Sequence, residues 1–125
     1  MIDHVSLAVA DLDASRTFYT ALLAPLGLSL LVERKDRLGF GKSYPEVWLN
    51  LRQPFPDPGG DPGAHICLRA RTPEAVTEFH AKGIAHGGSS DGGPGPRQAS
   101  MTRYFAAFIR DPDGNRIEAA SFPAA

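Results

Sequence analysis

The feature that most constrains the fold is a pattern that occurs twice, with matched positions 61 residues apart. In each half of the 125-residue chain, a short alternating segment is followed by a segment with helical spacing of apolar residues. Aligning the two places His4 on His65 and Phe18 on Phe79. A repeat of about half the chain indicates a duplicated structural unit. We therefore expect two similar modules.

The first module begins with a predicted strand at residues 2–10, where apolar and polar side chains alternate. Alternation with a period of two is typical of a strand with one face in a core. His4 falls on the polar face of this strand. Asp11 can cap the helix that follows, and Pro25 and Gly27 end it.

The second module repeats this order from Ala64 to Ala70, where His65 lies on the polar face of the predicted strand. Thr72 is a suitable N-cap, and Pro73 is a suitable first helical residue. The pattern predicts a helix that ends near Gly83. Each half therefore begins with a strand followed by an amphipathic helix.

Further strands are predicted at Leu28–Glu33, around Leu38–Lys42, and at Val47–Leu51, Tyr104–Ile109 and Arg116–Ser121. The Asp111–Gly114 segment predicts a tight turn of a hairpin. The Gly, Ser and Pro residues of Gly87–Pro96 favour a loop, either a lid or a loop at a sheet edge.

Each half thus has the pattern βαβββ, and the whole chain is predicted to be one α+β domain. Module one covers about residues 1–53 and module two about residues 64–125. Residues 54–63, rich in Pro and Gly, are expected to link them.

Four polar residues fall on the strand face opposite the helices: His4, Asn50, His65 and Glu118. If the sheets curl into a cup, these side chains converge near its centre. Two imidazoles and one carboxylate form a set that binds Fe(II), Mn(II), Ni(II) or Zn(II) and leaves positions open for substrate. We therefore predict metal ligation by His4, His65 and Glu118.

Four segments resemble a known family: Ile2–Val9, Ser15–Tyr19, Ala64–Leu68 and, most specifically, Asp111–Glu118. The pattern is similar to that of the vicinal oxygen chelate superfamily. This superfamily includes glyoxalase I, extradiol dioxygenases, fosfomycin-resistance enzymes and bleomycin-resistance binding proteins. The resemblance implies paired βαβββ modules that form a cup-shaped mixed sheet, with the helices on the outer face.

Carried over position by position, the resemblance implies metal ligands at His4, His65 and Glu118. Asn50 falls where glyoxalase I has a carboxylate ligand, so this chain departs from glyoxalase I itself. The remaining set resembles that of extradiol dioxygenases and fosfomycin enzymes. An amide cannot serve as the base that the glyoxalase reaction uses.

The resemblance implies a divalent-metal-dependent enzyme of the lyase, isomerase or dioxygenase type, whose substrate binds the metal through two neighbouring oxygens. We predict that Tyr104 is a catalytic hydrogen-bonding or acid/base partner. Trp48, Asn50 and Arg103 are predicted to contact the substrate. The alternative function is that of a metal-free protein which binds a small molecule, as bleomycin-resistance members do.

Composition excludes some other partners. The formal net charge is −1 and neither sign forms a run, which argues against nucleic acid and anionic membranes. No signal-peptide pattern or long apolar stretch is present, and the single cysteine fits a reducing compartment, so we expect a cytoplasmic protein. Superfamily members commonly dimerise, so we expect a homodimer with modules paired within a chain or exchanged between chains.

Overall fold

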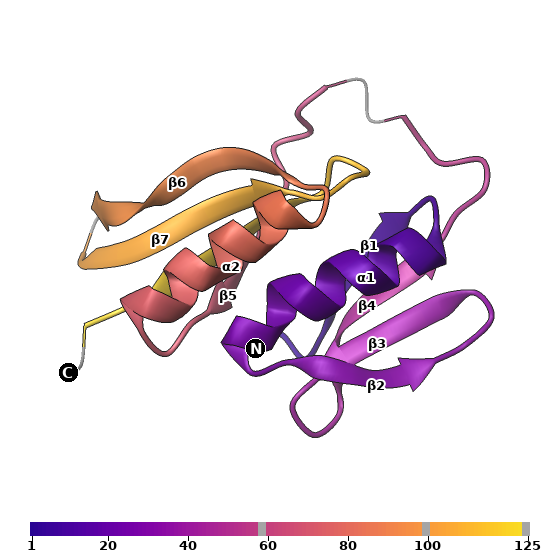
Figure 1. Ribbon diagram of the computed structural model, residues 1–125, viewed down its shortest axis with the longest axis horizontal. Helices are drawn as coiled ribbons and strands as arrows, with labels where there is room; N and C mark the ends of the chain where they lie inside the picture. Colours follow the sequence, from indigo (N-terminus) through magenta and orange to yellow (C-terminus); the bar gives the residue numbers. More distant parts are fainter. Residues whose placement is uncertain (58–59, 99–100, 124–125) are drawn as a thin grey trace.

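The computed structural model describes residues 1–57, 60–98 and 101–123, and it contains two four-stranded sheets with one long helix each (Figure 1). The first half comprises β1 (Val5–Val9), α1 (Leu12–Leu23), the short 3₁₀ helix η1 (Ala24–Leu26), β2 (Ser29–Glu33), β3 (Arg37–Gly41) and β4 (Pro45–Leu51). The second half comprises β5 (Ile66–Arg69), α2 (Pro73–Ala85), β6 (Ser89–Gln98), β7 (Arg103–Arg110) and β8 (Arg116–Ser121).

The two sheets have the same topology, with strand orders β1-β4-β3-β2 and β5-β8-β7-β6. In each sheet the first strand pairs in parallel with the last, and the other neighbours are antiparallel. Each half is therefore a βαβββ module, and the predicted α+β fold class is confirmed. The first strand of each module, β1 or β5, lies at the edge of its sheet.

Both helices begin where the sequence predicts. The Asp11 side chain accepts a hydrogen bond from the Ala14 amide, and the Thr72 side chain accepts one from Ala75. These caps satisfy amide groups that have no partner within the helix. Among the described residues, no helix has the length and apolar character needed to cross a membrane.

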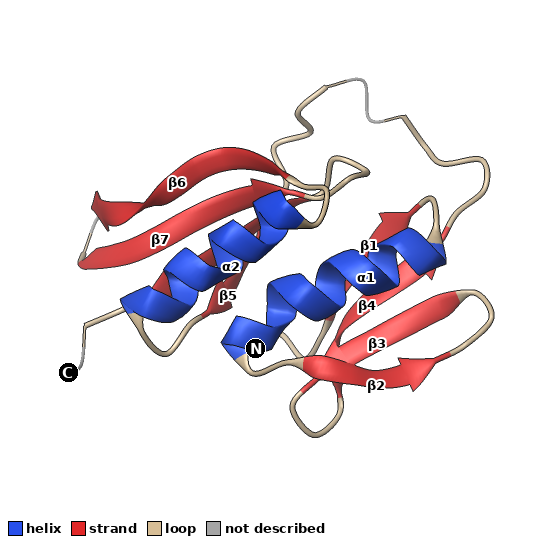
Figure 2. Cartoon of the chain, in the orientation of Figure 1, coloured by secondary structure: helices blue, strands red, loops and turns tan. Residues whose placement is uncertain are grey.

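The two helices pack against each other, and their buried side chains form the core that joins the two halves (Figure 2). Phe18 and Leu22 of α1 are fully buried, as are Val76 and Phe79 of α2. Gly83 allows this close approach, because a Cβ atom there would lie 2.9 Å from Ile109 Cδ1 and 3.1 Å from Leu22 Cδ1. Both modules therefore share one apolar core.

The prediction of a loop at Gly87–Pro96 is wrong, because most of this segment belongs to β6. β6 pairs antiparallel with β7, and its register shifts between Ser90 and Gly92 and again between Gly92 and Gly95. An edge strand tolerates proline and bulges, since one of its sides needs no ladder hydrogen bonds. Pairing with β7, rather than the strand propensity of its own residues, determines this element.

The predicted turn at Asp111–Gly114 is confirmed, with the Gly114 amide donating to the Asp111 carbonyl at 3.0 Å. Asp111 is buried and lies against α1, where Tyr19 Oη donates to its Oδ2 at 2.6 Å. Asn115 Nδ2 donates to both Asp111 Oδ2 and the Ala8 carbonyl. Asp113 Oδ2 accepts from the Ala10 amide. This turn thus ties module two to β1 and α1 of module one.

The Asp111 carboxylate is held in a poorly solvated position. Burial raises the pKa of Asp111 above its ordinary value, although hydrogen bonds from Tyr19 and Asn115 act in the opposite direction. A raised native pKa means that the folded chain holds this proton more tightly than the unfolded chain. The contribution of Asp111 to stability therefore declines as the pH rises from its ordinary pKa through its native one.

We expect Tyr19→Phe to lower the free energy of unfolding by about 1–3 kcal/mol at neutral pH, because a buried carboxylate loses a donor. The loss should shrink as the pH falls through the native pKa of Asp111, since the protonated carboxyl depends less on that donor. Urea unfolding at several pH values measures both effects.

The matched control is Tyr44→Phe, because the Tyr44 hydroxyl contacts the exposed Asp3 carboxylate at 3.3 Å. We expect this change to alter stability by no more than about 0.5 kcal/mol. Equal losses for the two variants, or a Tyr19→Phe loss independent of pH, would contradict the role given to Asp111.

Candidate functional site

The candidate site lies on β5 and β8, which are parallel neighbours in the second sheet. Alternation along β5 places Ile66 and Leu68 against the core, so that His65, Cys67 and Arg69 lie on the opposite face. Glu118 on β8 is the register partner of Cys67 and shares that face. The two strands therefore bring an imidazole and a carboxylate from distant parts of the chain to one place.

His65 Nε2 lies 3.0 Å from Glu118 Oε1. The Glu118 residue is only 5% exposed, whereas the His65 side chain is 48% exposed. A buried carboxylate is costly unless a donor or a cation compensates its charge. The His65 imidazole is one such partner, and about half of its side chain remains accessible.

Tyr104 and Cys67 also lie beside Glu118. Burial, followed by the negative charge of Glu118, raises the pKa of the Tyr104 phenol. The same two causes, in the same order, raise the pKa of the Cys67 thiol to about 12. At neutral pH both groups keep their protons, so Tyr104 can donate a hydrogen bond and Cys67 is a poor nucleophile.

His4 does not join this pair within one chain. Its side chain is 52% exposed, and its Nδ1 lies 2.8 Å from Asp3 Oδ1. His4 and His65 both line a hollow of about 550 Å³ between β1 and β5. In the part of the chain that the structure describes, no group of three or more His, Cys, Asp or Glu side chains is close enough to hold a metal ion.

Asn50 and Trp48 lie on β4, in the first sheet. Asn50 is the register partner of Ala8 on β1 and of Arg37 on β3. The Trp48 ring packs over Gly39, where a Cβ atom would lie 2.9 Å from the ring, and the Arg37 guanidinium lies 5.9 Å from the ring centroid. Trp48 and Asn50, which were predicted to contact the substrate, therefore lie on the strand next to β1, which His4 directly precedes.

Arg103 lies in another hollow, of about 460 Å³, near the first turn of α2. Arg71 and Glu74 line the same hollow, and Tyr104 borders it. Because Arg103 and Tyr104 are consecutive residues of β7, their side chains leave opposite faces of the strand. Sequence reasoning missed Cys67, Arg69 and Phe108, although the alternation that selected His65 also places Cys67 and Arg69 on its face.

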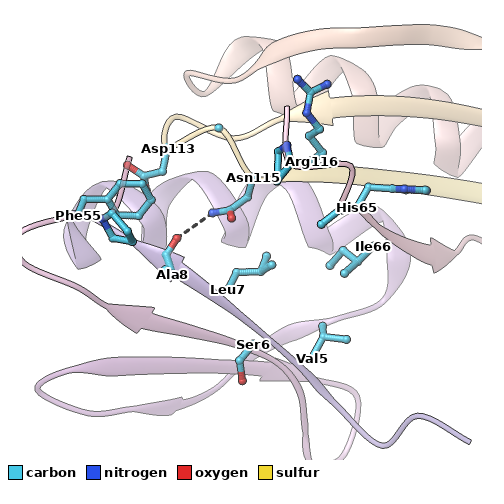
Figure 3. A pocket seen from close by; sticks show the side chains of 14 residues that line it. Val5, Ser6, Leu7, Ala8, Phe55, His65, Ile66, Asp113, Asn115 and Arg116 are labelled. Atoms are coloured by element: carbon cyan, nitrogen blue, oxygen red, sulfur yellow. Dashed lines mark hydrogen bonds between the residues drawn. The ribbon is translucent and has the colours of Figure 1, made fainter. Parts of the chain in front are cut away.

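A further hollow, of about 540 Å³, lies along the seam between β1 and β5. Figure 3 shows Phe55 on one side of it and Ile66 on the other, with Leu7 between them. The hydrogen bond from Asn115 to the Ala8 carbonyl closes one end. The edges of the two sheets are therefore separated by open, mostly apolar space.

Comparison with known proteins identifies relatives along nearly the whole chain. Residues 1–119 match the family model described as "Glyoxalase/Bleomycin resistance protein/Dioxygenase superfamily". A virulence protein of Salmonella typhimurium is 31% identical over an alignment of 130 positions, which covers 97% of this chain and 83% of that protein.

Solved structures agree with this match. A crystal structure of a glyoxalase/bleomycin resistance protein from Albidiferax ferrireducens has a TM-score of 0.83 and 34% identity, covering 95% of this chain and 97% of that one. A glyoxalase-related enzyme from Fulvimarina pelagi, at 18% identity and a TM-score of 0.74, shares the fold over 98% of this chain and 88% of its own.

We expect Cys67 to react with iodoacetamide at pH 8 more slowly in the folded chain than in the urea-unfolded chain, by on the order of a hundredfold or more. A thiol with a pKa of about 12 has very little thiolate at that pH. Glu118→Gln should accelerate the reaction, because it removes the negative charge beside the thiol. Quenched alkylation followed by mass spectrometry measures these rates.

Glu74→Gln, a change at an exposed position in the first turn of α2, is the control and should leave the rate unchanged. The rate for the folded chain should also keep rising above pH 10, where the unfolded thiol is already ionised. A rate that levels off near pH 9 in the folded chain would show that the Cys67 thiol is unperturbed.

Proposed function

Because this chain belongs to the Glyoxalase/Bleomycin resistance protein/Dioxygenase superfamily, we propose that it is a divalent-metal-dependent enzyme of the lyase, isomerase or dioxygenase type. Its substrate is a small molecule that presents two neighbouring oxygens. The observation that carries this proposal is the 3.0 Å contact between His65 Nε2 and the buried Glu118 carboxylate.

The residues of this site fit a divalent ion. An imidazole nitrogen and a carboxylate oxygen are ligands that Fe(II), Mn(II), Ni(II) and Zn(II) accept. Glu118 is buried, and a buried carboxylate favours a cation beside it. His65 and Glu118 would be the two ligands from this chain, and His4 of a second copy would be the third.

The sheet topology supports a third ligand from a second copy of the chain. β1 and β5 are edge strands, so a second copy can lay its β1 beside this chain's β5. His4 then faces the His65 and Glu118 pair across the subunit boundary, and Asn50 and Trp48 accompany it from the neighbouring strand. We therefore propose a homodimer in which module one of each subunit completes the site on module two of the other, and a cytoplasmic location.

The bound ion supplies Lewis-acid stabilisation of negative charge on the substrate oxygens. The chain's own residues position the substrate and donate hydrogen bonds to it. Tyr104 keeps its phenolic proton and donates a hydrogen bond to a substrate oxygen as negative charge develops there. Cys67 stays a thiol and forms a wall. The Phe108 ring, 6.1 Å from the His65 ring, forms another part of that wall.

Protein purified without chelator should contain a divalent metal ion in stoichiometric amount. His4→Ala, His65→Ala and Glu118→Gln should each reduce it to background, because each removes a ligand. Elemental analysis measures the content. His86→Ala is the matched control, since His86 caps α2 and its Nδ1 contacts the Lys82 carbonyl.

Mixing two inactive variants tests the exchange of modules. A dimer with His4→Ala in one subunit and Glu118→Gln in the other keeps one complete set of ligands if His4 serves the partner's site. Refolding an equimolar mixture should therefore restore part of the metal binding. If His4 serves its own subunit's site, every site in the mixture lacks a ligand and no binding returns.

Two outcomes would contradict the proposal. One is metal at background in the unaltered protein. The other is a melting temperature that EDTA leaves unchanged while a small apolar ligand raises it, as binding to the native state alone would do. The second outcome would instead support the metal-free binding function.

A further inference from the structure

The hollow at the start of α2 has its floor on the face of the second sheet that the helix covers. This floor is a row of register partners on three neighbouring strands, Pro96 of β6, Phe105 of β7 and Ser121 of β8. Register partners present their side chains on one face of a sheet. Phe105 packs against the core, whereas Glu118 leaves β8 on the opposite face from Ser121. The floor of the hollow and the candidate site therefore lie on opposite faces of the sheet.

One wall of this hollow is the segment that leads from β5 into α2. It consists of Arg71, Thr72, Pro73 and Glu74. Figure 1 shows that α2 and β7 begin at the same end of module two. α2 has 13 residues, and the N-terminus of such a helix carries a partial positive charge. An anion in the hollow would therefore lie at the favourable end of the helix.

Ser121 is a buried polar residue that lines the hollow, and it is only 5% exposed. Within the part of the chain that the structure describes, no group forms a hydrogen bond with its hydroxyl. Its oxygen is nevertheless not closed off completely from the surface. Buried polar groups in proteins nearly always have a hydrogen-bonding partner. The Ser121 hydroxyl is therefore available to donate to an acceptor atom in the hollow.

Three charged side chains line the hollow, those of Arg71, Arg103 and Glu74. Arg103 comes two residues before Phe105 on β7, so its side chain leaves the strand on the same face as Phe105. Among the described residues, neither arginine forms an ion pair with a carboxylate. Two positive charges and one negative charge leave a single positive charge. This balance matches a monoanion better than a dianion.

The rest of the lining is mostly apolar. It includes the side chains of Pro73, Pro96, Phe105, Phe122 and Pro123. The volume of about 460 Å³ lies within the range of roughly 300–1,000 Å³ that is usual for small-molecule sites. Such sites are lined mainly by apolar and aromatic side chains, with a few polar groups that orient the ligand. The hollow therefore has the size and the lining of a site for an organic molecule rather than an inorganic ion.

We propose that the hollow at the start of α2 binds a small monocarboxylate with an apolar or aromatic body. Its carboxylate group accepts hydrogen bonds from Arg71, Arg103 and Ser121, and its body packs on Phe105 and the neighbouring prolines. A guanidinium matches the planar geometry of a carboxylate and forms strong, charge-assisted hydrogen bonds with it. This inference goes beyond the proposed function, because it adds a second binding site that needs no metal ion.

The test is a titration of the purified full chain with benzoate, followed through backbone amide and arginine Nε–Hε signals by NMR. Benzamide is the neutral probe of the same shape, acetate is the carboxylate without an aromatic body, and phenyl phosphate is the dianion. We expect benzoate to shift the signals of Arg71, Thr72, Arg103 and Ser121. It should bind about tenfold or more tightly than benzamide or acetate, and more tightly than phenyl phosphate. EDTA should leave its affinity unchanged.

Arg71→Gln and Arg103→Gln should each weaken benzoate binding about tenfold, as expected for the loss of a charge-assisted hydrogen bond. Ser121→Ala should weaken it about fivefold, because the carboxylate loses a neutral donor. Glu74→Gln should strengthen it, since it removes the negative charge from the lining of the hollow. Melting temperatures establish that each variant is folded.

Two further variants serve as controls. Arg34→Gln removes an arginine at an exposed position between β2 and β3. His65→Ala removes the imidazole of the candidate site on the opposite face of the sheet. Neither change should alter the affinity for benzoate, because neither residue lines the hollow.

Equal affinities for benzoate and benzamide, or for benzoate and acetate, would overturn the inference. Undiminished benzoate binding in both arginine variants would do the same, and so would tighter binding of phenyl phosphate. Loss of benzoate binding in EDTA or in His65→Ala would assign the carboxylate to the candidate site and would also overturn it. Failure of the proposed function looks different. Metal content then stays at background while benzoate still binds in the hollow, which supports this inference alone.

Discussion

The buried carboxylate of Asp111 constrains how the two modules of this chain sit together. A carboxylate in that position needs donors, and it accepts hydrogen bonds from Tyr19, the amides of Asp113 and Asn115, and the Asn115 side chain. The same turn reaches β1 through Ala8 and Ala10. One set of hydrogen bonds therefore fixes β8 of module two relative to β1 of module one, and with it the separation of Glu118 from His4.

Glu118 is the second buried carboxylate, and its surroundings differ in kind. Asp111 accepts four hydrogen bonds from Tyr19 and from residues of its own turn, whereas Glu118 lies 3.0 Å from the His65 imidazole, with Tyr104 and Cys67 beside it. The first arrangement holds the Asp111 turn against β1 and α1 and so fixes the two modules together. The second places a buried carboxylate beside a half-exposed imidazole. For that reason Glu118, and not Asp111, belongs to the candidate site.

Much of this fold could be predicted from local signals. The caps at Asp11 and Thr72, the turn at Asp111 and the alternation of the first and fifth strands each depend on residues near one another in sequence. β6 could not be predicted, because its Gly and Pro residues form a strand only through pairing with β7. The candidate site was likewise predictable in part. Alternation places His65 and Glu118 on one face, and the β5–β8 register then brings them together.

The sequence by itself determined which side chains share a strand face, because the backbone of a strand alternates with a fixed period whatever surrounds it. It also determined the order of elements in the two modules. Only the tertiary structure decided which of these faces meet. The distance between β1 and β5 depends on the helix packing at Gly83 and on the Asp111 hydrogen bonds, which join residues far apart in the chain. For that reason the pairing of His65 with Glu118 and the separate position of His4 emerge only from the folded chain.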